Sequence, residues 1–155
     1  MGEPGNGFVW PVRVYWEDTD AGGIVFYANY LKFFERARTE WLRELGIEQQ
    51  RLRDTLNGMF VVTDTLLKYR QPARLDDFLL VTARLTEAGR ASLTIAQSAY
   101  RCAAGTHTAA NVPRDPHAQG NTLLCEGSIR IGWVDASTLR PHRIPDTILQ
   151  ALQRP

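Results

Sequence analysis

Two carboxylates and two glycines stand close together in the stretch DTDAGGIVFYANY, residues 18–30. Asp18 and Asp20 come first, Gly22 and Gly23 follow, and a helical pattern begins directly afterwards. A carboxylate beside the free N–H groups of a helix N-terminus combines a base or nucleophile with an oxyanion site, which is what acyl transfer needs. The glycines would let a ligand approach the backbone closely. Spacing alone also allows a plainer interpretation, in which one Asp caps the helix and the other is a solvated turn residue.

Most other catalytic arrangements find no support in the sequence. Of the three His residues, His107 and His117 lie in a loop-like stretch and His142 in a proline-punctuated tail, whereas a Ser-His-Asp arrangement needs a rigidly held His. The zinc patterns HExxH and CxxC are absent, and so are the glycine-rich phosphate loops, so neither a metal nor a cofactor is expected. If the chain is an enzyme, carboxylates and backbone donors must do its chemistry.

Composition narrows the class of protein further. A length of 155 residues suits one domain, taken here as residues 1–155, and a net charge of +1 argues against a nucleic-acid partner. The N-terminus lacks a signal-peptide pattern, and no apolar run reaches the roughly 18 residues of a membrane span, so a cytoplasmic protein is expected. Cys102 and Cys125 could pair, but two small buried thiols are the favoured interpretation in a reducing compartment.

Hydrophobic periodicity predicts the elements on either side of the acidic pair. FVWPVRVYWED alternates with period two, which predicts a half-buried strand with Val12, Val14 and Trp16 on one face. Residues 28–46 then change to a helical period, with Gly46 as a natural stop. The expected helix carries one continuous apolar stripe, formed by Tyr30, Phe34, Ala37, Trp41 and Leu45.

The rest of the chain returns to strands. We expect a short helix near 48–56, strands at 59–70, 77–89, 92–102 and 122–135, and a last short helix starting near Pro145. Residues 103–121 are rich in Ala, Gly and Pro and are expected to form an exposed, mobile hairpin connection. One strand, a long helix and then four strands indicate an α+β domain whose antiparallel sheet wraps the aromatic stripe of the helix.

The stretch VRVYWEDTDAGGIVFYANYLKFFERARTEWLR resembles the hot-dog-fold acyl-CoA thioesterases of the Tol–Pal-associated (YbgC) type. It is similar, more distantly, to 4-hydroxybenzoyl-CoA thioesterase. The likeness continues through YRQPARLDDFLLV and RPHRIPDTIL and covers most of the chain except residues 103–121. The resemblance implies an antiparallel sheet wrapped around one long central helix. It also implies a homo-oligomer in which two sheets join edge to edge, with active sites at the dimer interface and dimers often pairing into tetramers.

The resemblance also assigns roles to individual residues. It places the catalytic carboxylate on Asp20 and the oxyanion donor on the backbone N–H of Tyr27. Gly22 and Gly23, which leave room for a ligand at the backbone, are expected to contact the substrate. Many YbgC-type members carry His at position 27, whereas Tyr stands here as in the hydroxybenzoyl enzyme, so the preference for aliphatic or aromatic acyl groups stays open. Arg90, in the turn EAGRAS, matches a basic residue that holds the phosphates of coenzyme A, and a solvated turn residue is the alternative.

Two further groups of charged residues are weaker candidates. In PARLDD, Arg74, Asp76 and Asp77 are interpreted mainly as turn and strand-start residues. On the helix, Glu35 and Arg38 are expected in ion pairs at the surface.

Together these features predict an acyl-CoA thioesterase that releases a carboxylic acid and free coenzyme A without a metal. Asp20 would attack the thioester carbonyl or activate water, and the sequence leaves both routes open. The main alternative is a non-catalytic hot-dog module that binds acyl-CoA, acyl carrier protein or protein partners. A hot-dog hydratase fits worst, because that class pairs a His with a carboxylate and the site region has no His.

Overall fold

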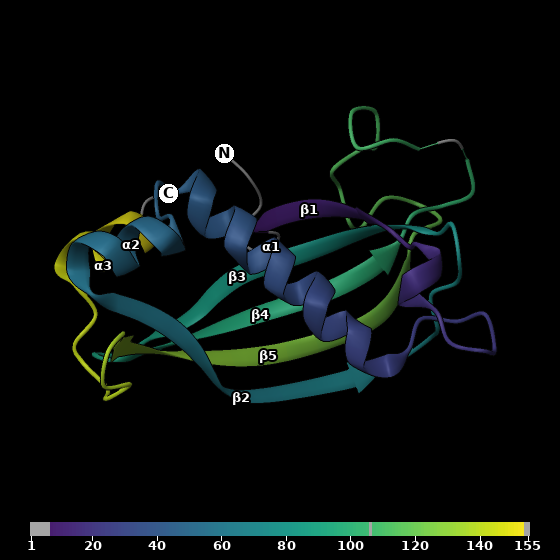
Figure 1. The fold of residues 1–155 in the computed structure, drawn as a ribbon. Helices are drawn as coiled ribbons and strands as arrows, with labels where there is room; N and C mark the ends of the chain where they lie inside the picture. The colour runs from purple at the N-terminus through teal and green to yellow at the C-terminus, as the bar shows by residue number, and fades with distance from the viewer. Residues whose placement is uncertain (1–6, 106, 154–155) are drawn as a thin grey trace.

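One five-stranded antiparallel sheet and one long helix dominate the computed structural model, which describes residues 7–105 and 107–153 (Figure 1). The strands lie in the order β1-β3-β4-β5-β2, so β1 and β2 form the two edges. The strand bounds are β1 Phe8–Arg13, β2 Gly58–Tyr69, β3 Phe78–Ala88, β4 Ser92–Arg101 and β5 Thr122–Asp135. The helices are α1 Tyr30–Glu44, α2 Gln49–Leu56 and α3 Asp146–Leu152, with single 3-10 turns η1 at Trp16–Asp18 and η2 at Tyr27–Asn29.

The core lies between α1 and one face of the sheet. Helix α1 buries Tyr30, Phe34, Ala37 and Trp41, as the predicted stripe requires, while Leu45 packs against the core from just beyond the last turn. The sheet contributes alternate residues of its central strands to this core, among them Leu79, Val81, Leu93, Ile95, Ile129 and Ile131. Figure 1 shows α1 crossing the sheet with α2 and α3 gathered at one end. The predicted α+β hot-dog architecture, a sheet wrapped around a central helix, is confirmed.

None of the helices within the described residues is long and apolar enough to cross a membrane.

The first strand is shorter than predicted, and Trp16 does not face the core. Val12 and Val14 are buried as expected, but β1 ends at Arg13 and the Trp16 side chain is 80% exposed. The cause is a local hydrogen bond: the Asp18 carboxylate accepts the N–H of Tyr15 at 2.8 Å, which coils the chain into η1. A period-two pattern does not register this competition between a side chain and the strand.

Arg38 is a second correction, because it is buried rather than at the surface. Its Nη1 donates to Oε1 of Gln97 at 2.9 Å, and Nε2 of Gln97 donates to the carbonyls of Phe34 and Thr82 at 3.0 and 3.1 Å. Burial lowers the pKa of Arg38. The partner Gln97 comes from β4, 59 residues away in the chain, so helix periodicity could not reveal it.

The 103–121 segment makes specific contacts with the sheet. Val112 is buried with Phe78 and Leu80 on the face of the sheet opposite to α1. Nη1 of Arg114 donates to the carbonyl of Val9 on β1 at 3.2 Å. Much of the segment is exposed as predicted, but Val112 is not, and the mobility of the segment stays a prediction.

Candidate active site

Asp18 is a structural residue of the acidic stretch. Its side chain is 5% exposed, and besides the bond to Tyr15 its own carbonyl accepts the N–H of Phe26 at 3.1 Å and Nδ2 of Asn29 at 2.8 Å. These bonds tie the start of the loop to the approach to α1. Neither aspartate caps α1, because its N-cap is Asn29 and no side chain bonds to that cap. The capping interpretation is therefore wrong.

Asp20 lies at an exposed turn and its carboxylate is accessible. The loop closes through a bridge between Thr19 and Val25, and the N–H of Asp20 donates to the carbonyl of Ile24 at 2.9 Å. One carboxylate oxygen, Oδ1, accepts the N–H of Gly22 at 2.8 Å. The other oxygen, Oδ2, makes no hydrogen bond within residues 7–105 and 107–153, and Asp20 is exposed.

Glycine stands at the two positions of this turn for different structural reasons. A Cβ at Gly22 would stand 3.2 Å from Oδ1 of Asp20, so a side chain there would crowd the carboxylate. Gly23 has φ +78°, a left-handed conformation that side chains other than glycine rarely adopt. The glycines thus shape the environment of Asp20, and their expected contact with substrate stays a prediction.

The start of η2 offers two backbone donors beside this loop. Among the described residues, the N–H groups of Tyr27 and Ala28 have no protein acceptor, as expected at the first turn of a helical segment. The carbonyl of Phe26 accepts the N–H of Asn29 at 2.8 Å, which fixes the plane of the peptide that carries the Tyr27 N–H. The predicted oxyanion donor is therefore free and oriented.

An apolar hollow of about 290 Å³ adjoins these donors. Its wall is supplied mainly by Ile24, Val25, Tyr27, Tyr30, Tyr69 and Pro72. Tyr30 is buried and accepts the N–H of Ala73 through its hydroxyl at 3.0 Å, and burial raises the pKa of its phenol. A small acyl group could lie here with its carbonyl near η2.

Arg90 is not near Asp20 within one protomer. The Asp20 loop joins the start of β3, through a bridge between Ile24 and Arg74, while Arg90 lies in the turn after the end of β3. The 11 residues of β3 separate them by roughly 33 Å of extended chain. Figure 1 shows the two loops at opposite ends of the sheet.

Arg130 is a candidate that the sequence pattern did not reveal. Arg90 and Arg130 line one surface hollow of about 430 Å³, and Nη2 of Arg130 donates to Oγ of Ser92 at 3.3 Å. Glu87 also lines this hollow, so its charge is not purely positive. Alternation along 122–135 marks Arg130 as outward-facing, but only the strand register, which pairs it with Thr94, brings it beside Arg90.

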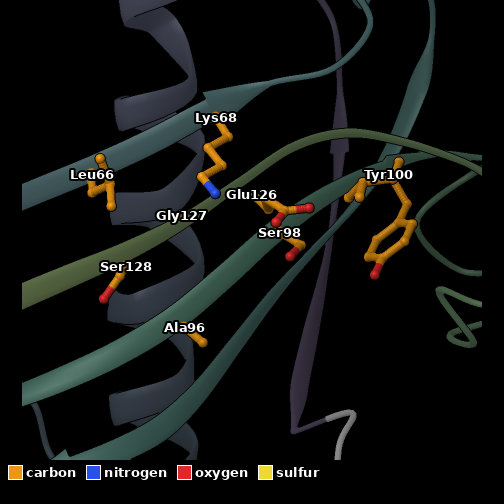
Figure 2. Close-up of a pocket in the computed structure, with 9 residues that line it drawn as sticks. Leu66, Lys68, Ala96, Ser98, Tyr100, Glu126, Gly127 and Ser128 are labelled. Atoms are coloured by element: carbon orange, nitrogen blue, oxygen red, sulfur yellow. The ribbon is translucent and has the colours of Figure 1, made fainter.

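A further hollow of about 340 Å³ lies on the sheet face opposite to α1 (Figure 2). Its side chains come from three strands: Leu66 and Lys68 on β2, Ala96, Ser98 and Tyr100 on β4, and Glu126 and Ser128 on β5. Glu126 is paired with Arg70 at 3.4 Å. None of the predicted site residues lines this hollow, so it is separate from the candidate active site.

The two cysteines are free thiols, as favoured from the sequence. Cys125 is completely buried and Cys102 is partly buried. Burial, with a smaller effect of Glu126, raises the pKa of Cys125 to about 12, so this thiol is a poor nucleophile. Within the part of the chain that the structure describes, no three His, Cys, Asp or Glu side chains cluster as metal ligands would.

These features define a hot-dog-fold protein whose candidate site offers an accessible carboxylate, two free backbone N–H groups and an apolar hollow. A comparison with protein families places the chain within this class. The chain belongs to the thioesterase superfamily, whose sequence profile matches residues 22–102.

Individual relatives give the same picture. An acyl-CoA thioesterase YbgC from Haemophilus influenzae is 38% identical over 147 residues, which cover 94% of each chain. An acyl-CoA thioester hydrolase YbgC from Escherichia coli O6:H1 is 39% identical over 142 residues, which cover 92% of each chain. The solved structure of a 1,4-dihydroxy-2-naphthoyl-CoA thioesterase from Synechocystis matches with a TM-score of 0.77 at 18% identity, over 94% of both chains. At that identity the structural match shows the shared fold alone.

Proposed function

We propose that this chain hydrolyses acyl-CoA thioesters to a carboxylic acid and free coenzyme A. The relatives that share 38–39% of its residues over almost the whole chain are named for this activity. The observation that carries the proposal is the loop of residues 18–30, which presents an exposed Asp20 carboxylate and, among the described residues, two free N–H groups at η2. The same loop supplies Ile24, Val25, Tyr27 and Tyr30 to the wall of an apolar hollow.

Each part of the loop has a role in this reaction. The thioester carbonyl accepts the N–H of Tyr27, which stabilises the negative charge that develops on its oxygen. Asp20 then acts in one of two ways. As nucleophile it bonds to the carbonyl carbon, the C–S bond breaks, coenzyme A leaves as thiolate, and water hydrolyses the resulting anhydride. As general base it takes a proton from the water that attacks the carbonyl carbon; the tetrahedral intermediate then collapses, the C–S bond breaks, and coenzyme A leaves as thiolate.

A second copy of the chain would complete the site. Strand β2 is an exposed sheet edge that carries two solvent-facing apolar side chains, Val62 at 52% and Leu66 at 63% exposure. Such an edge favours pairing with another strand. If two β2 strands pair antiparallel about a two-fold axis, the Arg90 end of one sheet lies beside the Asp20 loop of the other. Arg90 and Arg130 of the second copy would then hold the phosphates of coenzyme A.

A cytoplasmic location fits the two free thiols and a coenzyme A substrate. Acyl carrier protein is a further candidate partner, because it presents the same thioester on a phosphopantetheine arm. The alternative of a non-catalytic binding module differs in one observable respect, since it predicts tight binding of coenzyme A without turnover.

The test is an assay of purified protein against a panel of aliphatic and aromatic acyl-CoAs, with a thiol reagent detecting released coenzyme A. We expect turnover of at least one thioester, unchanged by EDTA. Light scattering on the same sample distinguishes a monomer from a dimer or tetramer. Binding of coenzyme A with no turnover of any thioester would favour the binding module, and turnover that EDTA abolishes and zinc restores would contradict a carboxylate mechanism.

A further inference from the structure

Tyr69, the last residue of β2, is bonded directly to the segment that carries the oxyanion donor. Its hydroxyl donates to the carbonyl of Tyr27 at 2.9 Å, across 42 residues of sequence. Its ring packs edge-on against Tyr27 and Tyr30, with centroid separations of 6.2 and 5.6 Å. Tyr69 is 47% exposed, so this contact is not simply part of the buried core.

The bond acts on the peptide group between Tyr27 and Ala28. In a planar trans peptide the C=O and N–H point in opposite directions, so fixing the Tyr27 carbonyl also fixes the direction of the Ala28 N–H. That N–H has no acceptor among the described residues. A hydrogen bond to a carbonyl also polarises its peptide and strengthens the N–H as a donor. The neighbouring peptide is held in the same manner, because the Phe26 carbonyl accepts the N–H of Asn29.

Other contacts also hold the region around this bond, so the role of the Tyr69 hydroxyl can be tested separately from the attachment of the loop. The N–H of Val25 donates to the carbonyl of Ala73 at 2.8 Å, and the N–H of Ala73 donates to the hydroxyl of Tyr30 at 3.0 Å. Loss of the Tyr69 hydroxyl therefore leaves the loop attached to the segment after β2. What it removes is the side-chain bond from Tyr69 to the carbonyl of Tyr27.

We propose that Tyr69 is a positioning residue for the thioesterase reaction, which orients the backbone of Tyr27 and Ala28 as a paired oxyanion site. This inference rests on the proposed hydrolysis of acyl-CoA. It assigns the reaction a second donor, the Ala28 N–H, and a residue on the edge strand whose hydroxyl acts through the backbone of Tyr27, while its ring lines the hollow.

The test is Tyr69→Phe in the full chain, which keeps the ring and removes the hydroxyl. We expect kcat to fall about tenfold with KM for acyl-CoA nearly unchanged, a smaller loss than the roughly 10²–10³-fold effect of deleting an oxyanion donor outright. Tyr100→Phe is the matched control, because Tyr100 lies on the sheet face opposite to α1. This substitution should leave kcat unchanged. Thermal unfolding of each variant reports stability.

A binding measurement separates positioning from a merely structural role. A trifluoromethyl ketone analogue of acetyl-CoA forms a tetrahedral, oxyanion-like adduct, whereas coenzyme A alone has no carbonyl. We expect Tyr69→Phe to weaken the ketone by about the same factor as kcat and to leave coenzyme A affinity unchanged. If wild type turns over acyl-CoA and Tyr69→Phe matches it in kcat, or loses affinity for both ligands equally, the inference is wrong. If wild type turns over no acyl-CoA, the proposed function itself fails.

Discussion

At the scale of single residues, the two acids of the DTD stretch have separate tasks. Asp18 is buried and holds the loop through Tyr15, whereas Asp20 is exposed and keeps one oxygen free. The sequence suggested that one of the pair does chemistry, and the family resemblance pointed to Asp20. The structure adds a physical reason for the difference, since Asp18 is buried and its carboxylate accepts the N–H of Tyr15, whereas Asp20 is exposed.

Substitution by Asn distinguishes these tasks. Asp20→Asn keeps the shape and can still accept the N–H of Gly22, but an amide is neither a base nor a useful nucleophile. We expect kcat to fall by at least about 10²-fold, the lower bound for general acid–base groups, with little change in melting temperature. Asp18→Asn should show the opposite pattern, a lower melting temperature and a smaller loss of kcat. If Asp18→Asn is inactive while Asp20→Asn remains active, the roles are reversed.

The raised pKa of Cys125 leads to a prediction of how the stability of the fold depends on pH in the alkaline range. Its pKa is about 12 in the folded protein against 9.0 for a model thiol, so between these values the unfolded chain has lost a proton that the folded chain retains. Stability must therefore fall as pH rises through this window. Tyr30, whose pKa is also raised, adds a decline of the same sign. Urea midpoints from pH 7 to 11 should fall less steeply for Cys125→Ala than for wild type, and equal slopes would contradict the assignment.

At the scale of elements, long stretches of uniform period were predicted best. The last strand was expected at 122–135 and is observed there, because Cys125, Ile129, Ile131 and Trp133 recur on one face and both ends carry turn signals. The helix was equally clear from its aromatic stripe. The misplaced residues are Trp16 and Arg38. The position of Trp16 depends on the bond from the N–H of Tyr15 to the Asp18 carboxylate, and that of Arg38 on its bond to Gln97. Likewise, Arg130 could be recognised as a neighbour of Arg90 only from the strand register. Tyr69 could be recognised as a neighbour of Tyr27 only from the way the loop of residues 18–30 closes.

The 103–121 segment gives a prediction at this scale. Arg101 and Thr122 are directly opposite in the β4–β5 ladder, so a two-residue Asn-Gly turn can replace the whole segment together with Cys102. We expect turnover of the best acyl-CoA to stay within tenfold of wild type, because no residue of the segment lines the apolar hollow at η2. Stability should fall, since burying one Val contributes about 1.5–3 kcal/mol and the replacement removes Val112.

A matched variant separates the two effects. Val112→Ala in the full chain removes only the buried side chain, so it should lower the urea midpoint without changing kcat. A loss of turnover beyond tenfold in the replaced chain, with folding intact, would mean that the segment helps to form the site.

At the scale of the whole molecule, the two ends of the sheet carry different candidate residues. One end carries the acidic loop and the oxyanion donors, and the other carries Arg90 and Arg130. One protomer cannot bring a single coenzyme A molecule to both ends, because about 33 Å of β3 lies between them. In the proposed pairing of β2 edges, a two-fold axis sets unlike ends side by side. Each site would then take its carboxylate from one copy and its guanidinium groups from the other.

Subunit complementation tests this arrangement directly. Asp20→Asn removes the carboxylate from its own site, and Arg90→Ala removes a phosphate contact from the site across the interface. A dimer containing one of each variant therefore has one site with both defects and one site with neither. Unfolding and refolding an equal mixture should restore about a quarter of wild-type turnover at low acyl-CoA, because half the dimers are mixed and each has one intact site.

The controls are the two variants refolded separately, and these should each stay well below the mixture. Size-exclusion chromatography with differently tagged chains confirms that mixed dimers have formed. Should Arg90 serve the site of its own protomer instead, every site in a mixed dimer would carry one defect, and mixing would restore no turnover. If Arg90 is only a solvated turn residue and the phosphates bind elsewhere, Arg90→Ala alone would be as active as wild type, and the mixture would show about half of wild-type turnover, the average of the two variants. The complementation assay together with this single variant therefore decides whether the two ends of the sheet meet across the β2 edge.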